Sequence, residues 1–225
     1  MDGKAPIVMP HLWTRRKLIG TMALAFAAPG TLAAQLALTP KQTEGPFYPD
    51  RLPLDTDNDL LIVNDGITSG IGEVTYLSGR LLDKNGSPIR NAVVEIWQVD
   101  GKGVYLHTGS DGKAGRDANF QGFGRFLTGS DGRYCFRTIK PIAYPGRTPH
   151  IHFAVKMKGR EKWTTQCYVK GEPQNDKDRV LLGIKDAKAR KSVIVDFAAL
   201  QESKIGELAA RFDIVMGYTP ADIGH

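Results

Sequence analysis

Short hydrophobic runs separated by turn residues dominate the chain from about residue 73 onward. Asn85-Gly86 and Asp131-Gly132 stand between such runs, and both dipeptides are typical of tight turns between strands. Runs of this length and spacing predict an all-β fold, an antiparallel β-sandwich with few short helices. We expect strands at Val74–Leu82, Ala92–Val99, Arg133–Ile139, Ile151–Met157, Thr164–Val169, Ser192–Phe197 and Arg211–Met216.

The residues in front of these strands form a separate segment. Residues 35–72 lack a firm strand pattern and are expected to form an irregular N-terminal arm, followed by the sandwich domain over residues 73–225. Within the sandwich, a helix is expected around Val180–Ala189 and a turn near Leu200–Ile205. The length of 225 residues suits one domain with a short extension.

The N-terminus has the pattern of an export signal over residues 1–34. Arg15-Arg16-Lys17 precede the apolar run Met22–Ala28, and small residues follow at Thr31–Ala34. Paired arginines in this position indicate the twin-arginine route to the periplasm. The apolar run is too short to cross a bilayer, so no membrane span is expected after the signal is removed. An uncleaved N-terminal helix is the alternative interpretation.

Composition and charge limit the kinds of binding partner that the sequence predicts. Hydrophobic residues make up 41% of the chain and charged residues 24%, as in ordinary soluble globular proteins. Half of the net charge of +6 comes from residues 1–34, where four basic residues stand against one acidic residue. The chain has no basic stripe with interleaved aromatic residues, so no nucleic-acid partner is predicted.

The two cysteines, Cys135 and Cys167, leave two interpretations open. An exported protein could pair them in a disulfide. We favour two buried thiols that act as small apolar residues, because each cysteine stands between strand-like neighbours. Their wide spacing does not predict a metal site.

A His-x-His motif is the first indication of a functional site. His150-Ile151-His152 opens a predicted strand, and the two-residue period of a strand puts both imidazoles on one face. The prolines Pro145 and Pro149 stiffen the loop that leads into the motif. Two neighbouring imidazoles make half of a metal site, but packing or chance can also explain a lone His-x-His motif.

The surrounding segments are similar to those of a known family. Together they resemble the intradiol ring-cleavage dioxygenases, which include the protocatechuate and catechol dioxygenases, and the resemblance covers roughly residues 38–217. The segments that carry it are Thr43–Tyr48, Val94–Gln98, Tyr105, Phe136–Pro141, Tyr144-Pro145, Arg147, Pro149–Phe153 and Phe212–Val215.

The resemblance implies a ferric-iron site. Tyr105 and His150 would be the equatorial protein ligands, and Tyr144 and His152 the axial ones. Phenolate oxygens are hard donors that stabilise ferric over ferrous iron, and neutral imidazole completes the set. A tyrosine hydroxyl has a pKa of ~10, so the charge of the metal must expel its proton.

The resemblance also implies a reaction. A catecholic ring would be cleaved by dioxygen between its two hydroxylated carbons to give a muconate-type dicarboxylate. Tyr144 would act as a general base when it leaves the metal. Arg147 would stabilise negative charge that develops on the ring, and Gln166 would support it. Taken singly, each tyrosine is more typical of packing and Arg147 of a solvated loop, so the hypothesis depends on their occurring together.

Three further aromatic residues in these segments are not expected to bind metal or substrate. His107, two residues beyond Tyr105, is expected at the surface or behind the metal ligands. Trp97 and Phe153 are expected in the core rather than in a substrate-binding wall.

Two departures from the family leave substrate and assembly open. The loop from Tyr144 to His150 is shorter than in protocatechuate dioxygenases, and the long N-terminal helical stretch through which catechol dioxygenases dimerise is missing. The particular catechol therefore stays open, as does a homo- or hetero-oligomeric state. Whether Thr43–Tyr48 covers the site of its own chain or of a neighbour is equally undecided.

Two other functions compete with this one. Gly79–Asp83, Gly86–Pro88 and Ala92–Val94 resemble the opening of transthyretin-like and carboxypeptidase-regulatory-like sandwiches, which are non-catalytic binding modules. A zinc hydrolase could use His150 and His152, but zinc would usually require a third histidine, cysteine or carboxylate ligand.

Overall fold

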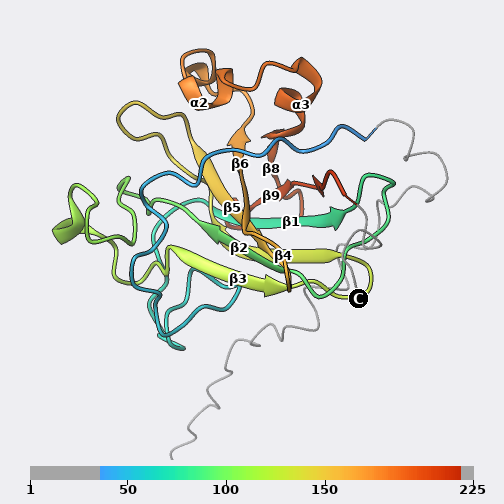
Figure 1. Cartoon of the computed structure of the whole chain (residues 1–225). Coiled ribbons are helices and arrows are strands. Elements are labelled where there is room, and N and C mark those ends of the chain that lie inside the picture. Colours follow the sequence, from blue (N-terminus) through green and yellow to red (C-terminus); the bar gives the residue numbers. More distant parts are fainter. Residues whose placement is uncertain (1–35, 219–225) are drawn as a thin grey trace, which may run out of the picture. The chain divides into compact units, whose positions relative to one another are not determined.

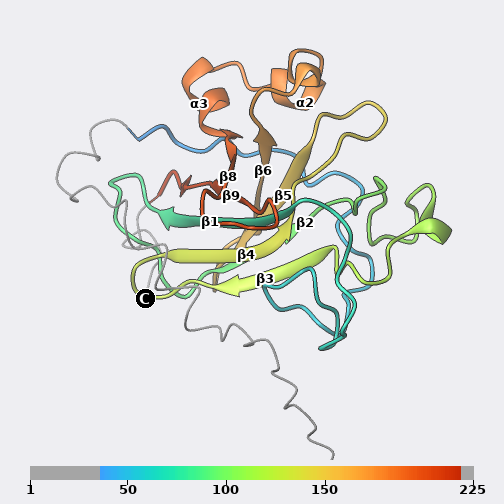
Figure 2. The same cartoon turned by 180° about the vertical axis from the view of Figure 1, so that it is seen from behind.

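Two five-stranded sheets make up the fold in a computed structural model that describes residues 36–218 (Figures 1 and 2). The predicted export signal lies outside the described residues. The first sheet has the order β10 (Ile214–Val215), β1 (Val74–Leu82), β9 (Leu208–Arg211), β8 (Phe197–Ala199), with β4 (Arg133–Ile139) also paired to β1. The second has the order β3 (Phe123–Leu127), β2 (Val93–Trp97), β5 (His150–Lys156), β6 (Trp163–Val169), β7 (Ile194–Val195). The predicted sandwich-like, all-β fold is confirmed.

Most predicted strands are present, with small differences in their bounds and a larger one after residue 190. Strands β1 and β4 have the predicted bounds, and β2, β5 and β6 differ by one or two residues at their ends. The run predicted at Ser192–Phe197 is divided between β7 and β8, which lie in different sheets. Strand β3 was not predicted, because its sequence combines a glycine and an arginine with only three hydrophobic residues.

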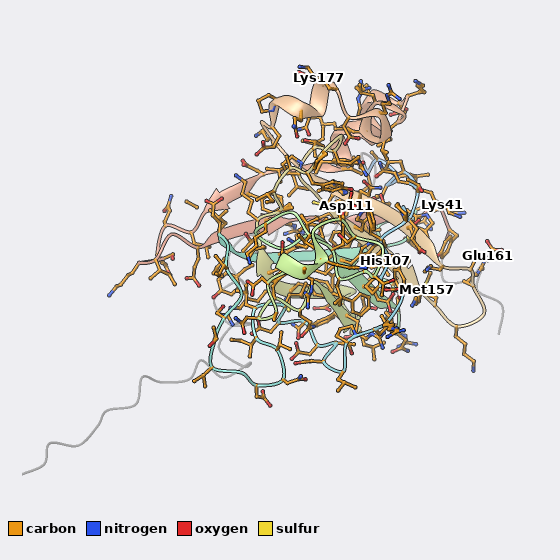
Figure 3. All side chains as sticks on the ribbon, turned by 90° about the vertical axis from the view of Figure 1, so that its left-hand side faces the viewer. Lys41, His107, Asp111, Met157, Glu161 and Lys177 are labelled. Atoms are coloured by element: carbon orange, nitrogen blue, oxygen red, sulfur yellow. The ribbon has the colours of Figure 1, made fainter. Side chains whose placement is uncertain are left out.

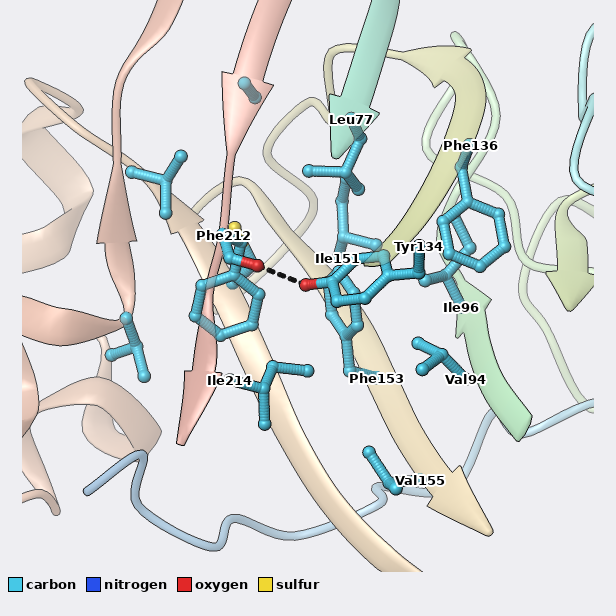
Figure 4. Close-up of a cluster of buried hydrophobic side chains, with 14 of the residues drawn as sticks. Leu77, Val94, Ile96, Tyr134, Phe136, Ile151, Phe153, Val155, Phe212 and Ile214 are labelled. Carbon is cyan, nitrogen blue, oxygen red and sulfur yellow. Dashed lines mark hydrogen bonds between the residues drawn. The ribbon is translucent and has the colours of Figure 1, made fainter. Parts of the chain in front are cut away.

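The core lies between the facing sides of the two sheets (Figure 4). Leu77 and Phe136 come from the first sheet, and Ile151 and Phe153 from the second, and each is at most 1% exposed. Burying a side chain of this size contributes about 1.5–3 kcal/mol. Because side chains alternate along a strand, the inward position of Ile151 and Phe153 turns the histidines of β5 to the outer face of the second sheet.

A glycine permits the close crossing of two segments in the first sheet. The Tyr134 hydroxyl donates a hydrogen bond to the carbonyl of Phe212, in the segment between β9 and β10 (Figure 4). A Cβ atom at Gly79 on β1 would lie 1.8 Å from that carbonyl oxygen. Only glycine allows the chain to pass so close to β1.

The N-terminal arm belongs to the same compact unit as the sandwich. The Arg125 N–H on β3 donates to the Thr56 carbonyl, and the Leu60 N–H donates to the Arg137 carbonyl on β4. The arm therefore covers the open edges of one strand from each sheet, which protects their unpaired backbone groups. Leu60 and Leu61 are fully buried in the core.

The first predicted turn joins two different sheets. The Gly86 N–H donates to the Asp83 carbonyl, so the Asn85-Gly86 turn forms as expected. The antiparallel pairing beyond it reaches only the bridge between Leu82 and Pro88. The chain then crosses from the first sheet to the second.

The helices are short. The helix expected over Val180–Ala189 is instead two helices, α2 (Arg179–Leu182) and α3 (Ala187–Ser192), each capped at its N-terminus by an aspartate side chain. The described residues also include the 3-10 helices η2 (Lys113–Gly115) and η3 (Pro173–Asp176). Among residues 36–218, no helix is long and apolar enough to cross a membrane. Both cysteines carry free thiols.

Candidate metal centre

Strand β5 presents two buried histidines on the outer face of the second sheet. His150 and His152 are 1% and 2% exposed. His152 is paired with Trp97 on β2 and with Gln166 on β6. The histidines therefore stand on the central strand of the sheet, with a rigid neighbour on either side.

A buried carboxylate shapes the loop that carries Tyr105. The Asp100 carboxylate accepts hydrogen bonds from the N–H groups of Lys102 and Val104, at 2.8 and 3.0 Å. The Tyr105 N–H donates to the Ser110 hydroxyl at 3.1 Å, and the tyrosine is 2% exposed. Tyr105 is thus fixed by its own loop, although this loop has no regular secondary structure.

Tyr144 lies in the loop between β4 and β5. The Arg147 N–H donates to the Tyr144 carbonyl at 3.0 Å, which closes a turn with Gly146 at a φ of 81°. The Tyr144 side chain is half-buried, and its ring packs edge-on against Tyr105 with the centroids 5.5 Å apart. Of the predicted ligands, this one has the most contact with solvent.

The four predicted ligands converge. The Tyr105 hydroxyl lies 3.1 Å from His152 Nε2, 3.3 Å from His150 Nε2 and 3.5 Å from the Tyr144 hydroxyl. The two Nε2 atoms are 3.1 Å apart. Residues far apart in the sequence thus bring two phenol oxygens and two imidazole nitrogens together.

Hydrogen bonding alone does not satisfy this cluster. The His150 Nδ1–H donates to the Thr148 carbonyl at 2.6 Å, so Nε2 of the neutral ring carries a lone pair. His152 Nδ1 is buried without a partner. If His152 carries its proton on Nε2, then Nδ1 is an unsatisfied acceptor. If the proton is on Nδ1, two Nε2 lone pairs face each other.

A single cation among the four atoms would remove this conflict. Two ligand atoms that each lie about 2.1 Å from one metal ion, at 90–110° to each other, are about 3.0–3.4 Å apart. The observed separations of 3.1–3.5 Å are close to this range. Within residues 36–218, no third histidine, cysteine or carboxylate joins the pair of histidines, so the two phenols are the other donors of the cluster.

Burial sets the protonation of these groups. It lowers the pKa of His150 to about 4, with a further contribution from the nearby charge of Arg147. Burial, followed by the influence of His150, also keeps the pKa of His152 well below its usual value. Both imidazoles are therefore neutral at pH 7, the form that binds metals. Burial raises the pKa of Tyr105 well above its usual value, so its phenolate form requires a cation beside it.

Arg147 is held beside the cluster by two side chains. Its Nε–H donates to the Asp178 carboxylate at 2.8 Å and its NH2 group donates to Gln166 Oε1 at 2.6 Å. Burial disfavours the charge of Arg147, but the hydrogen bond and charge of Asp178 outweigh it and raise the pKa of the guanidinium. The Arg147 side chain is 17% exposed, so it is not a solvated loop arginine.

Asp178 anchors this arginine from the start of α2. Its side chain is fully buried and also accepts the N–H groups of Thr148, Val180 and Leu181. The sequence reveals it only as a helix-capping aspartate, because its partner Arg147 is 31 residues away. This residue was missed as part of the site.

Gln166 contacts Arg147 and the N-terminal arm. Its Oε1 accepts from Arg147 and from the Tyr168 hydroxyl, and its Nε2 donates to the Thr43 carbonyl at 3.1 Å. These bonds place Gln166 between Arg147 and the N-terminal arm. A direct catalytic role for Gln166 stays a prediction.

Two aromatic residues pack on the donor cluster. The Trp97 indole, expected simply in the core, is stacked on His152 with the centroids 4.7 Å apart and the planes at 9°. Phe47 of the arm is stacked on Tyr105 at 4.9 Å. The segment Thr43–Tyr48 therefore lies on the cluster of its own chain. His107, half-buried at the edge of Phe47, lies on the side of the sandwich that carries the η2 loop (Figure 3).

The chain is similar in sequence to known dioxygenases. A family model described as Dioxygenase matches residues 43–217. The protocatechuate 3,4-dioxygenase beta chain of Burkholderia cepacia is 38% identical over 173 residues, which cover 73% of this chain and 72% of the relative. Catechol 1,2-dioxygenase 1 of Acinetobacter lwoffii is 30% identical over 153 residues, or 60% of this chain and 47% of the relative. This chain thus spans about half the length of the catechol and hydroxyquinol relatives that it matches.

Solved structures are similar in fold. The dioxygenase domain of a dioxygenase–carbohydrate-binding protein fusion from Streptomyces sp. SirexAA-E has a TM-score of 0.63 and 29% identity, covering 81% of this chain and all of that chain. Catechol 1,2-dioxygenase from Acinetobacter sp. ADP1 has a TM-score of 0.61 and 26% identity, covering 80% of this chain and 63% of that chain.

Proposed function

Because this chain belongs to the intradiol ring-cleavage dioxygenase family, we propose that it is a ferric dioxygenase that cleaves catecholic rings. The observation that carries the proposal is the convergence of the Tyr105 and Tyr144 hydroxyls with Nε2 of His150 and His152. The substrate would be an aromatic ring with two adjacent hydroxyl groups. The carbon–carbon bond between the hydroxylated carbons would break, and both atoms of dioxygen would enter a muconate-type dicarboxylate.

The donor set suits ferric iron. Two hard phenolate oxygens favour the ferric over the ferrous state, and two neutral imidazoles complete a four-residue protein set. Iron bound there would supply Lewis acidity and accept electron density from a chelated catecholate, which makes the ring open to attack by dioxygen. A non-catalytic binding module is not favoured, because it gives no reason for four polar groups to converge in a buried place.

Tyr144 is the residue suited to move a proton. Tyr105 is held by its loop, and His150 and His152 are held by a central strand. Tyr144 is half-buried in a surface loop, so its side chain can turn away at a lower cost. Its phenolate oxygen would take a proton from a catechol hydroxyl as the catechol binds, acting as a general base.

Arg147 would supply a fixed positive charge. Asp178 and Gln166 hold the guanidinium in place before any substrate binds. A cation that is already oriented stabilises negative charge on the ring without a reorganisation cost. The same positive charge would also favour binding of the dianionic substrate.

The experiment that tests the proposal combines colour with dioxygen uptake. Phenolate bound to ferric iron absorbs visible light, so the iron-loaded protein should be coloured and should change colour with catechol, protocatechuate or hydroxyquinol. One dioxygen should be consumed per ring, with a dicarboxylate as product. Tyr105→Phe should weaken the absorption, whereas Tyr76→Phe, whose hydroxyl binds Glu207 away from the cluster, should not. A colourless protein without dioxygen uptake would contradict the proposal.

We further propose that the protein is exported through the twin-arginine route. Arg15-Arg16 and the apolar run that follows them support this localisation. Residues 1–40 fused to a reporter enzyme should carry it to the periplasm, and replacing both arginines by lysine should stop the transport. A reporter that stays in the cytoplasm in both forms would contradict the export proposal and leave the catalytic one intact.

A further inference from the structure

We propose that Gln42 of the N-terminal arm is a positioning residue for Arg147, acting through Tyr168 and Gln166. The contacts among these four residues are independent of the reaction. The consequence for turnover rests on the proposed function, because it assumes that the arginine acts on the bound ring.

The arm is attached to the edge of β6 at Gln42. The Gln42 N–H donates to the Thr164 carbonyl at 2.9 Å, and the Thr164 hydroxyl donates to the Gln42 carbonyl at 2.6 Å. The Gln42 side chain is buried, with 9% of the residue exposed. Its amide group therefore makes its hydrogen bonds inside the protein, where an unmade bond is costly.

The hydrogen bonds fix the direction of each amide. Gln166 Oε1 accepts from both Arg147 and the Tyr168 hydroxyl, at 2.6 and 3.0 Å. Because the Tyr168 hydroxyl gives its one proton to Gln166, it must accept from a donor, and Gln42 Nε2 donates to it at 2.8 Å. Gln42 Oε1 in turn accepts the Gln166 N–H at 3.0 Å.

The far end of this chain of bonds is the arginine. Asp178 holds the Nε–H edge of the Arg147 guanidinium, and Gln166 holds its NH2 group. With two anchors the planar group has one orientation, whereas with Asp178 alone it could pivot about that bond. Gln166 keeps its Oε1 toward Arg147 because Tyr168 and the Thr43 carbonyl define the two ends of its amide.

Gln42→Glu tests this inference with almost no change in shape. The new carboxylate could still accept from the Gln166 N–H and the Thr165 hydroxyl, but it could not donate to Tyr168. The Tyr168 hydroxyl would then donate to that carboxylate and release Gln166. Tyr168→Phe removes both hydrogen bonds of that hydroxyl, the one accepted from Gln42 and the one donated to Gln166, and serves as the second variant.

The matched control is Thr165→Val. The Thr165 hydroxyl donates to the Pro40 carbonyl and contacts Gln42 Oε1, so its loss weakens the attachment of the arm. It leaves the bonds from Gln42 through Tyr168 and Gln166 to Arg147 in place. The control separates docking of the arm from orientation of the arginine.

In the iron-loaded enzyme, Gln42→Glu and Tyr168→Phe should keep the iron content and visible absorption of the parent. Their kcat should fall about tenfold, with KM within about twofold, because both variants loosen the hydrogen bond from Arg147 to Gln166, and a hydrogen bond to a charged group contributes at least this much. Thr165→Val should keep kcat. An equal loss of kcat in all three variants would assign the effect to docking of the arm and overturn the proposal.

A second measurement needs neither iron nor turnover. In the ¹⁵N-labelled metal-free protein, the guanidinium N–H signals of Arg147, assigned through Arg147→Lys, should exchange faster with water in Gln42→Glu and Tyr168→Phe than in Thr165→Val. Unchanged exchange in the first two variants would overturn the inference. Because this readout does not depend on catalysis, it distinguishes a failure of the proposed function from a failure of the positioning role of Gln42.

Discussion

At the scale of single residues, Tyr144 differs from the other three donors because its side chain is only half-buried. We predict that Tyr144→Phe retains iron through the three buried ligands but loses the proposed base. General bases contribute factors of 10²–10⁴, so kcat should fall at least about 100-fold. Iron content and dioxygen uptake measure the two effects. Loss of iron together with activity would make Tyr144 a structural ligand, and unchanged turnover would remove it from the base role.

Asp178 is expected to make the stability of the fold depend on pH in the acidic range. Burial favours its neutral form, but the Leu181 N–H and the Arg147 guanidinium outweigh burial and lower the pKa of this carboxyl. A carboxyl whose folded-state pKa lies below its unfolded value of ~3.9 stabilises the fold above that value, and this contribution is lost as the pH falls through the folded-state pKa.

The stability difference between the parent protein and Asp178→Asn should therefore depend on pH. Measured as the free energy of unfolding in urea, it should be constant from pH 7 to about 5 and shrink below about pH 4. A difference that stays constant to pH 3 would contradict the assigned direction of the pKa shift.

At the scale of elements, the N-terminal arm is part of the fold rather than an appendage. Leu60 is fully buried between the sheets, whereas Leu54 of the same segment is 98% exposed. We predict that Leu60→Ala lowers the free energy of unfolding by about 2–5 kcal/mol, the range for a core leucine, and that Leu54→Ala changes it by less than about 0.5 kcal/mol. Denaturant unfolding of both variants tests this. An effect of Leu60→Ala as small as that of Leu54→Ala would show that the arm does not contribute to global stability.

The sequence pattern predicts strands well where local alternation decides them. Val74–Leu82 and Arg133–Ile139 have the predicted bounds because they are long and flanked by turns. The arm has no such alternation, since single residues such as Leu60 enter the core from an irregular segment. Its backbone pairs with strand edges from both sheets, and this pairing depends on distant residues.

The site was predictable only in part from local pattern. The two-residue period of a strand places His150 and His152 together. Tyr105 and Tyr144 are separated from each other by 39 residues, and their convergence depends on two loops that no periodicity describes. Their assignment came from family resemblance. The sequence pattern did not connect Gln42 or Asp178 with the site, because each contacts a partner at least 31 residues away.

At the scale of the whole molecule, the donor cluster joins the arm, the η2 loop region and the second sheet. Phe47 of the arm packs on Tyr105, and Trp97 of β2 packs on His152. A metal ion bound by the four donors would therefore link segments that are otherwise held by packing and hydrogen bonds. Unfolding would separate these donors, so the metal should bind the folded state in preference to the unfolded chain.

Removal of iron should consequently lower thermal stability. With free metal at about a thousand times its Kd, binding contributes about 4 kcal/mol, which corresponds to a shift in Tm of about 10 °C for a chain of this size. Differential scanning calorimetry of iron-loaded and iron-free protein measures the shift.

His152→Ala should abolish both iron binding and the shift, because it removes the donor closest to Tyr105. His107→Ala, which removes a histidine outside the cluster, should keep both. An equal Tm with and without bound iron would contradict the link between the metal and the fold, and full iron occupancy in His152→Ala would contradict its assignment as a ligand.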